Sequence, residues 1–363
     1  MNPNKYIGRC HVGVRASPQP TVLPYCYNLK ILIIKFVLMK YILLLGAGFS
    51  RNWGGLLANE VFEFLIGQKE IAQNADLKNL LWKHSKTGGF ENALAEIQGV
   101  SGTNHQNLRN LQILQTAVSN VFERMNKAFF ATTDMEFQED VNQMLRTFLV
   151  RFDAIFTLNQ DVLLEHHYFP HINLTGGTRW KGAQLPGMER IPHASDLSWG
   201  RDTWIPLQNQ GFQLEDNLQP CFKLHGSSNW KDSEGGSLLV IGGNKSSTIQ
   251  SHAVLKWYFK EFCRYLSDQN CRLFVIGYGF RDQHVNQEII NAVNKGLKFF
   301  IIDPSGSDVV QQANSSFGGA IYAKKNPLDD AFETGLIGAS RRSLSETFGN
   351  DRLSHENIMS FFD

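Results

Sequence analysis

Short apolar runs alternate along the chain with longer stretches in which apolar residues have helical spacing. Runs of this length that are apolar throughout are typical of strands buried on both faces of a parallel sheet. The predicted strands are Tyr41–Leu45, Phe152–Leu158, Phe222–Leu224, Leu273–Ile276 and Phe299–Ile302. Because helical segments separate them, the pattern predicts an α/β fold with a Rossmann-like parallel sheet.

Helices are predicted over Leu56–Ile66, over about Ser251–Ser267, and from a cap at Asp282 to a stop at Gly296. Residues 71–150 are mostly helical by spacing and predict a helical insertion between the first two strands. Two stripes carry this prediction, each spaced like the buried face of a helix: Leu111, Leu114, Val118, Val121, Phe122 and Met125, then Phe137, Val141, Met144, Leu145, Phe148 and Leu149.

We expect a compact domain over residues 39–305, preceded by an extension (1–38) and followed by a polar, weakly patterned tail (306–363) that could serve as an interaction segment. Lysines interrupt the apolar segment Leu29–Leu45 every five residues. A membrane-spanning helix needs about 20 continuous apolar residues, so we expect no membrane span. No small-residue cleavage pattern follows the segment, which argues against a signal peptide.

Composition narrows the class of protein. The chain has 363 residues, of which 42% are hydrophobic and 12% aromatic, and this excludes disorder as the dominant state. Lys+Arg (35) and Asp+Glu (34) nearly balance, whereas a protein that coats nucleic acid is normally far more basic. The five cysteines are scattered without a C-x-x-C pair, so we expect no zinc module, no disulfide framework and a cytoplasmic location.

Candidate chemistry gathers where the predicted strands end. Gly46-Ala47-Gly48-Phe49-Ser50 follows the first strand, and glycines at such a turn let the backbone approach a pyrophosphate. The strict G-x-G-x-x-G spacing fails because position 51 is arginine. The other strands are followed by Asn159 and Asp161, by His225, by Gly277-Tyr278-Gly279 and by Asp303.

Each of these residues alone has a structural explanation: a turn for Asn159, a core position for His225, a helix cap for Asp303. Ligands of open α/β sheets bind beyond the carboxyl ends of the strands, so the set together favours a ligand site. In Gly242-Gly243-Asn244-Lys245-Ser246-Ser247, asparagine occupies the place of the second P-loop glycine, which argues against nucleotide triphosphate hydrolysis. His166-His167 lacks metal-ligand spacing, and no G-x-S-x-G elbow is present.

The segments GAGFS, TLNQD, KLHGSSNW and VIGYGFRDQHVN, in this order, resemble the sirtuin-like family, and specifically its bacterial anti-phage branch. The resemblance covers roughly Lys40–Asp303. It implies that His225 is a general base, paired with Gly226, and that Asn159 and Asp161 face the nicotinamide ribose and its carboxamide. It also implies that Gly46, Ala47, Gly48 and Ser50 cradle the NAD phosphates, and that Gly277 and Asp303 border the adenine ribose.

Departures from the family pattern select among its activities. Deacetylating sirtuins carry a four-cysteine zinc module and a Pro-Asp-Phe-Arg segment after the glycine loop, and this chain has neither. Gly279 stands where the family usually has serine. The resemblance therefore implies an NAD⁺ hydrolase that releases nicotinamide and ADP-ribose and depletes NAD in anti-phage defence. It implies no metal and no cofactor beyond NAD⁺ as substrate.

Such an effector must stay silent until infection, so the resemblance implies a partner. A HerA-type hexameric ATPase is the first choice, an Argonaute-type protein the second, and the chain is expected to form a homo-oligomer. No direct nucleic-acid binding is expected. Two other functions stay open: an NAD-dependent protein deacylase, and a non-catalytic module that binds NAD or an ADP-ribose derivative. An ordinary dehydrogenase lacks support because no substrate-domain pattern follows the nucleotide fold.

Overall fold

The computed structural model describes residues 39–86, 89–102, 104–131, 139–174, 179–192, 200–208, 211–311 and 326–363. The expected extension (1–38), Phe137 of the second stripe, and part of the expected tail (312–325) lie outside these ranges.

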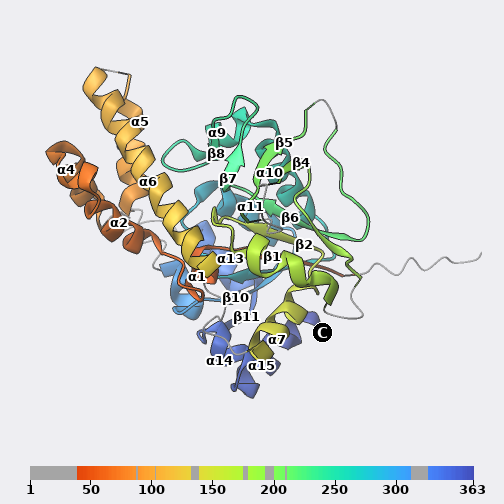
Figure 1. Cartoon of the computed structure of the whole chain (residues 1–363). Coiled ribbons are helices and arrows are strands. Elements are labelled where there is room, and N and C mark those ends of the chain that lie inside the picture. The colour runs from red at the N-terminus through yellow and green to blue at the C-terminus, as the bar shows by residue number, and fades with distance from the viewer. Residues whose placement is uncertain are drawn as a thin grey trace, which may run out of the picture. The chain divides into compact units, whose positions relative to one another are not determined.

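A seven-stranded sheet forms the centre of the described chain, and all of its strand pairs are parallel (Figure 1). The predicted Rossmann-like α/β fold is therefore confirmed. In spatial order the strands are β11 (Leu336–Ser340), β10 (Lys298–Ile302), β9 (Cys271–Ile276), β1 (Lys40–Leu45), β2 (Ala154–Thr157), β6 (Leu218–Lys223) and β3 (Gly182–Gln184).

The central strands are buried on both faces, as their uniform apolar sequence predicts. Ile42 to Leu45 of β1 are fully buried. Aromatic rings stack between neighbouring strands: Phe156 lies 4.7 Å from Phe222, and Phe274 lies 4.9 Å from Phe300, centroid to centroid. Such stacked contacts add to the stabilisation that the rings gain by burial, so these strands hold the loops at their ends in place.

The expectation of a polar tail is wrong for residues 326–363. This segment forms α13 (Pro327–Gly335), β11, α14 (Leu344–Phe348), α15 (Arg352–Met359) and a final 3₁₀ turn (Ser360–Phe362). Phe348, Ile358 and Phe361 are buried in the main core. The elements have only three to nine residues each, too few for a periodic pattern to stand out in the sequence.

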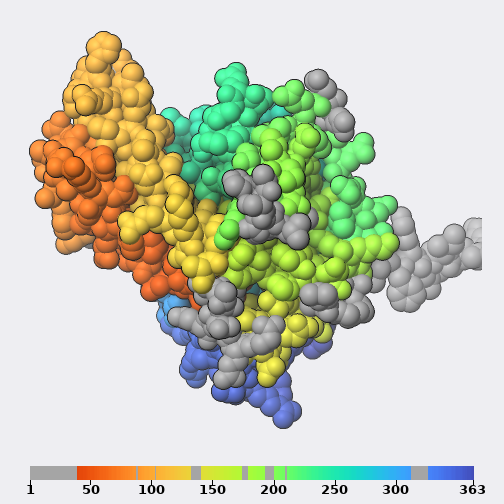
Figure 2. All heavy atoms as spheres, in the orientation of Figure 1, coloured from red at the N-terminus to blue at the C-terminus, as the bar shows by residue number. Residues whose placement is uncertain are grey.

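The described residues between 58 and 131 form a helical module (Figures 1 and 2). This module has an apolar core of its own. It comprises α2 (Ala58–Ile66), α3 (Lys69–Ala72), α4 (Ala75–His84), α5 (Gly89–Val100) and α6 (His105–Ala131). Its core residues include Leu65, Leu77, Leu81, Leu94, Leu114 and Val118. The next helix, α7 (Glu139–Leu149), instead packs Leu145, Phe148 and Leu149 into the core around the sheet. Of the first predicted stripe, Leu114, Val118 and Val121 lie in the core of the helical module, whereas Met125 lies in the core around the sheet together with Leu145, Phe148 and Leu149 of the second stripe.

A second, four-stranded sheet was not predicted. Its order is β4 (Met188–Ile191), β5 (Thr203–Pro206), β7 (Gly226–Lys231) and β8 (Ser237–Leu239). These strands have three to six residues and lie within a region rich in Gly, Pro and Trp, so their sequence has little period. The sheet matters for the site because β7 begins directly after His225.

The remaining helices connect strand ends to the layers that cover the sheet. They are α1 (Ala47–Arg51), α8 (Leu163–His167), α9 (Lys245–Ser251), α10 (Ala253–Leu266) and α11 (Gln283–Val293), with 3₁₀ turns at Phe169–Leu174 and Gly306–Asp308. Helices α10 and α11 match the predictions from sequence. Among the described helices, none is long and apolar enough to cross a bilayer. The described cysteines, Cys221, Cys263 and Cys271, are free thiols.

Candidate functional site

The predicted site residues follow the carboxyl ends of β1, β2, β6, β9 and β10. Because these strands are parallel and adjacent, their carboxyl ends lie at one edge of the sheet. The chain runs from β1 outward through β2 to β6, and then returns to place β9 on the other side of β1. Ligands of open α/β sheets bind outside such a reversal of strand order, and here the glycine-rich turns lie directly at it.

The glycines pack backbone against backbone. A Cβ on Gly48 would lie 2.7 Å from the Cα of Gly277, and a Cβ on Gly46 would lie 2.5 Å from the Gly277 carbonyl oxygen. Gly277 itself has a φ of 63°, which glycine adopts at little cost. The amides of Gly46 and Gly48 donate to the carbonyls of Ile276 and Gly277. These two N–H groups are thus already used inside the protein, so the glycines serve the close packing of two turns.

Ser50, Asn159 and Asp161 form a hydrogen-bonded cluster next to this contact. The Ser50 hydroxyl donates to Asp161 Oδ2 at 2.7 Å and accepts from Asn159 Nδ2 at 2.9 Å. Asn159 Nδ2 also donates to the Gly46 carbonyl at 2.9 Å. Ser50 and Asp161 are buried, whereas Asn159 is half-buried and Ala47 is exposed. We call these residues, with the three glycines, the packed half of the site.

A buried ion pair supports the loop that carries Asp161. Lys223 Nζ lies 2.6 Å from Glu165 Oε1 and also donates to the Asp161 carbonyl oxygen. Both side chains are almost completely buried, at 2% exposure for Lys223 and 1% for Glu165. Breaking such a pair strands a buried charge, so Lys223 fixes the path of this loop beneath the site.

His225 lies between β6 and β7 and is only 2% exposed. The next residue must be glycine, because Gly226 has a φ of 73° and a Cβ there would lie 2.1 Å from the Leu238 carbonyl oxygen. Gln160 ties this connection to the β2 loop: its carbonyl accepts from Ser228 N–H, and its side chain donates to the Val240 carbonyl. Burial lowers the pKa of His225 to about 3, so the imidazole is neutral at neutral pH.

Charged and titratable groups from three distant segments meet at His225. His225 Nε2 lies 3.2 Å from Nε2 of His284 in α11. Asp282 is at the N-cap position of α11, but its side chain makes no capping bond and instead accepts from Lys245 Nζ at 2.6 Å. Lys245 also pairs with Glu91 of the helical module at 2.7 Å. We call His225, His284, Asp282, Lys245 and Glu91 the ionic half of the site.

The pKa values in the ionic half follow from burial and pairing. Burial lowers the pKa of His284 as it does that of His225. Burial opposes the charged form of Asp282, but the neighbouring His225 and the hydrogen-bonded ammonium of Lys245 outweigh this effect and hold the pKa of this carboxyl low. Lys245 keeps its charge because Glu91 and Asp282 raise its pKa against the opposing effect of burial.

Asp303 lies at the end of β10, beside the glycine contact. Gly277 N–H donates to the neighbouring Ile302 carbonyl, and the Asp303 carboxylate accepts from Ser305 N–H at 2.8 Å. Arg341, directly after β11, approaches this turn: a Cβ on Gly306 would lie 2.9 Å from its side chain. The sequence did not predict that Arg341 lies near Asp303, because the segment that contains Arg341 is polar and weakly patterned.

Two site features escaped prediction because they depend on side chains far apart in the sequence. His225 and His284 are 59 residues apart, and Glu91 belongs to the helical module. The Asp-x-His spacing at 282 and 284, at the start of a predicted helix, is the signal that could have pointed to them.

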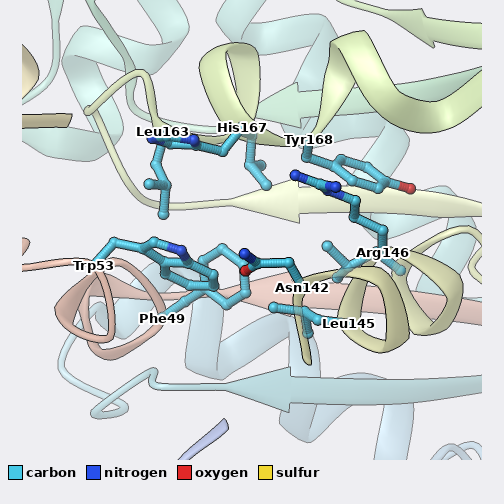
Figure 3. A pocket seen from close by; sticks show the side chains of 10 residues that line it. Phe49, Trp53, Asn142, Leu145, Arg146, Leu163, His167 and Tyr168 are labelled. Atoms are coloured by element: carbon cyan, nitrogen blue, oxygen red, sulfur yellow. The ribbon is translucent and has the colours of Figure 1, made fainter. Parts of the chain in front are cut away.

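A small pocket of about 20 Å³ lies between α1, α7 and α8 (Figure 3). It is mainly apolar and is lined by Phe49, Trp53, Asn142, Leu145, Arg146, Leu149, Leu163, Leu164, His167 and Tyr168. None of these is a predicted site residue, although Phe49 adjoins Ser50. Burial lowers the pKa of His167 to about 4, so its imidazole is neutral at neutral pH, and Arg146 is the charged side chain among the lining residues.

Comparison with known proteins found no matching family model and no matching curated relative. Among solved structures, the chain is similar to a mutant Sir2 homologue in complex with ADP-ribose, with 14% identity and a TM-score of 0.38 over 89% of this chain and 93% of that one. It is also similar to a Sir2 homologue–NAD complex (14% identity, TM-score 0.32, 89% and 91% covered) and to Sir2 bound to the inhibitor EX-527, 2′-O-acetyl-ADP-ribose and deacetylated p53 peptide (12%, 0.33, 88% and 94%). Likenesses this distant carry no argument about activity, which rests on the residues of the site.

Proposed function

We propose that the chain is an NAD⁺ hydrolase that cleaves the nicotinamide–ribose bond and releases nicotinamide and ADP-ribose. The observation that carries the proposal is the gathering of the glycine turns, the Ser50–Asn159–Asp161 cluster and His225 at one edge of the sheet, at the reversal of strand order. The sirtuin-like order of the four sequence segments supports the choice of NAD⁺ as substrate.

The chemistry asks for an oriented water and a base. Cleavage passes through an oxocarbenium-like state, as in glycoside hydrolysis, and nicotinamide leaves as a neutral molecule. In the proposed reaction water attacks the ribose carbon and gives its proton to His225. A base of this kind contributes about 10²–10⁴-fold to the rate. Burial keeps His225 unprotonated, and water entering the site would raise its pKa toward the ordinary value and strengthen it as a base.

The packed half assigns particular atoms to the substrate. Both hydrogens of Asn159 Nδ2 are used, one on the Gly46 carbonyl and one on Ser50. Its amide oxygen, Oδ1, is therefore the atom that would accept a hydrogen bond from a ribose hydroxyl or from the attacking water. The carboxylate of Asp161, held by Ser50 and by Leu163 N–H, would favour the positive charge that develops on the ribose.

The closed state of His225 supports an effector that is silent until triggered. At 2% exposure the imidazole meets substrate only after neighbouring elements move. In the proposed function a HerA-type hexameric ATPase provides the trigger, the chain acts as a homo-oligomer in the cytoplasm, and NAD depletion defends the cell population against phage. These assignments rest on the family resemblance alone.

The test is NAD cleavage by the chain alone and by the chain co-purified with its co-expressed ATPase. Nicotinamide and ADP-ribose are quantified by mass spectrometry. We expect His225→Ala and Asn159→Ala each to abolish most turnover without unfolding the protein, while the exposed His105→Ala keeps it. Near-native cleavage by His225→Ala would contradict the assigned base. Acyl transfer from an acyl-lysine peptide to ADP-ribose would indicate a deacylase, and NAD binding without product in both preparations would indicate a regulatory module.

A further inference from the structure

Three potential metal ligands converge in the ionic half. Within the described part of the chain, the ligand atoms of His225, Asp282 and His284 all lie within 4.8 Å of one another. We propose that these three side chains bind a first-row divalent metal ion, with Zn²⁺ as the best fit. Two imidazoles and one carboxylate, with a further position open to water, form a ligand set that zinc commonly takes.

The spacing of the two imidazoles fits a shared ion. Their Nε2 atoms are 3.2 Å apart. Two zinc–nitrogen bonds of about 2.0–2.1 Å at a tetrahedral angle place the nitrogens about 3.3–3.4 Å apart. The two rings therefore need almost no movement to accept an ion, whereas the Asp282 carboxylate must turn toward it.

The backbone holds the three groups in place. Asp282 and His284 open α11 two residues apart, and Tyr278 fixes this turn, because its hydroxyl contacts the Asp282 amide and carbonyl and donates to Asn286. His225 is fixed by the positive φ of Gly226. The ring of Phe259, 5.5 Å from His284, supplies an apolar neighbour. A site held in this way loses little conformational entropy when an ion binds.

Lys245 is the group that competes with the metal. Its ammonium occupies Asp282 Oδ1 and is shared with Glu91 of α5. A metal ion that takes the Asp282 carboxylate would leave Lys245 to Glu91, which still neutralises its charge. Metal binding would thus replace Lys245 by the metal ion at Asp282. The link from Asp282 through Lys245 to Glu91 of the helical module would then be broken at Asp282.

The position of the metal has a consequence that rests on the proposed function. The lone pair of His225 Nε2 cannot hold a metal ion and accept a proton from water at the same time. Zn²⁺ would therefore inhibit NAD cleavage reversibly, and removal of the ion by a chelator would restore it.

The binding test uses the full chain without NAD. The metal-free protein is titrated with Zn²⁺ in competition with a chromophoric chelator, and Co²⁺ serves as a spectroscopic probe of tetrahedral nitrogen and oxygen ligands. We expect one equivalent to bind, and His284→Gln to weaken it at least tenfold, since loss even of an outer-sphere partner costs about 10–100-fold. His105→Gln, an exposed histidine in α6, should change nothing.

A second variant, expected to bind Zn²⁺ more tightly, tests the proposal in a way that damage to the fold cannot imitate. Lys245→Met removes the competing ammonium and leaves Asp282 and Glu91 uncompensated, so Zn²⁺ should bind more tightly than to the wild type. Circular dichroism and thermal melting check that each variant is folded. Equal affinity in wild type and His284→Gln, or binding that is lost on His166→Gln instead, would overturn the proposal.

Measuring NAD cleavage with and without Zn²⁺ tests the metal site separately from the proposed hydrolase activity. Zinc binding by a chain that cleaves no NAD, alone or with its ATPase, would leave the metal site standing and count against the hydrolase. Cleavage that continues unchanged at saturating Zn²⁺ would overturn the claim that metal and proton compete for His225.

Discussion

Different interactions hold the two halves of the candidate site together. The packed half consists of glycines in van der Waals contact and of short neutral or singly charged hydrogen bonds, all within two turns and one loop. The ionic half joins α5, α9, α11 and the β6–β7 connection through charges and imidazoles. The first half is inseparable from the fold, whereas the second is an added set of interactions that can rearrange. Substitutions of the glycines and of Ser50 in the packed half should therefore cost stability, whereas substitutions in the ionic half should mainly change chemistry.

The largest effect on stability is expected for Gly277→Ala. A Cβ there would lie 2.4 Å from the carbonyl carbon of Gly48, on a residue with a φ of 63°. The combined cost of a left-handed alanine and of overpacking is about 2–5 kcal/mol. Gly296→Ala is the matched control, because Gly296 has a φ of 106° with open space around it and should cost only about 1–2 kcal/mol. Equal losses in chemical denaturation would show that close packing is not what holds the two turns.

Ser50→Ala should have an intermediate effect. It leaves Asp161 Oδ2 without its buried donor and Asn159 without one acceptor. An unsatisfied buried group costs about 1–3 kcal/mol, measured as the change in free energy of unfolding. Ser251→Ala, exposed on α9, is the control and should stay within about 0.5 kcal/mol. A Ser50→Ala protein as stable as the control would show that these hydrogen bonds of the packed half do not stabilise the fold.

His167, which belongs to neither half of the site, should make the stability of the protein depend on pH. Burial depresses its pKa from 6.5 to about 4, so its contribution to stability is present above pH 6.5 and is lost as the pH falls toward 4. His167→Gln should therefore lose less stability than the wild type over this window, measured by melting temperature against pH. Parallel curves for the two proteins would assign the acid sensitivity to other groups.

The smallest change is expected for Glu91→Gln. It removes one of two carboxylates on Lys245, and its side chain is 38% exposed, so the loss should not exceed about 1 kcal/mol. Lys83→Gln, which breaks the exposed pair with Glu96, is the control. A loss well above that of the control would mean that the ionic half also holds the helical module to the sheet.

Much of the fold was predictable from local pattern. The apolar runs at β1, β2, β9 and β10 identified strands buried on both faces, because only such strands lack alternation. Their parallel order then implied that Gly46, Asn159, His225 and Asp303 lie at one edge. The glycines at 46, 48 and 277 were also visible, although the reason for them is mutual packing as much as any ligand.

The rest was decided by contacts between segments distant in sequence. The strand β11 pairs with β10 only in the folded sheet, and this brings Arg341 to the turn after Asp303. The contact between His225 and His284, and the use of Lys245 by both Asp282 and Glu91, leave no periodic trace in the chain. The sequence by itself determined the strands, their parallel arrangement and the edge where the chemistry gathers, because hydrophobic period and turn residues are local properties. Only the tertiary structure decided which side chains share a hydrogen bond or an ion pair, because those interactions depend on distances of a few ångströms between residues far apart along the chain.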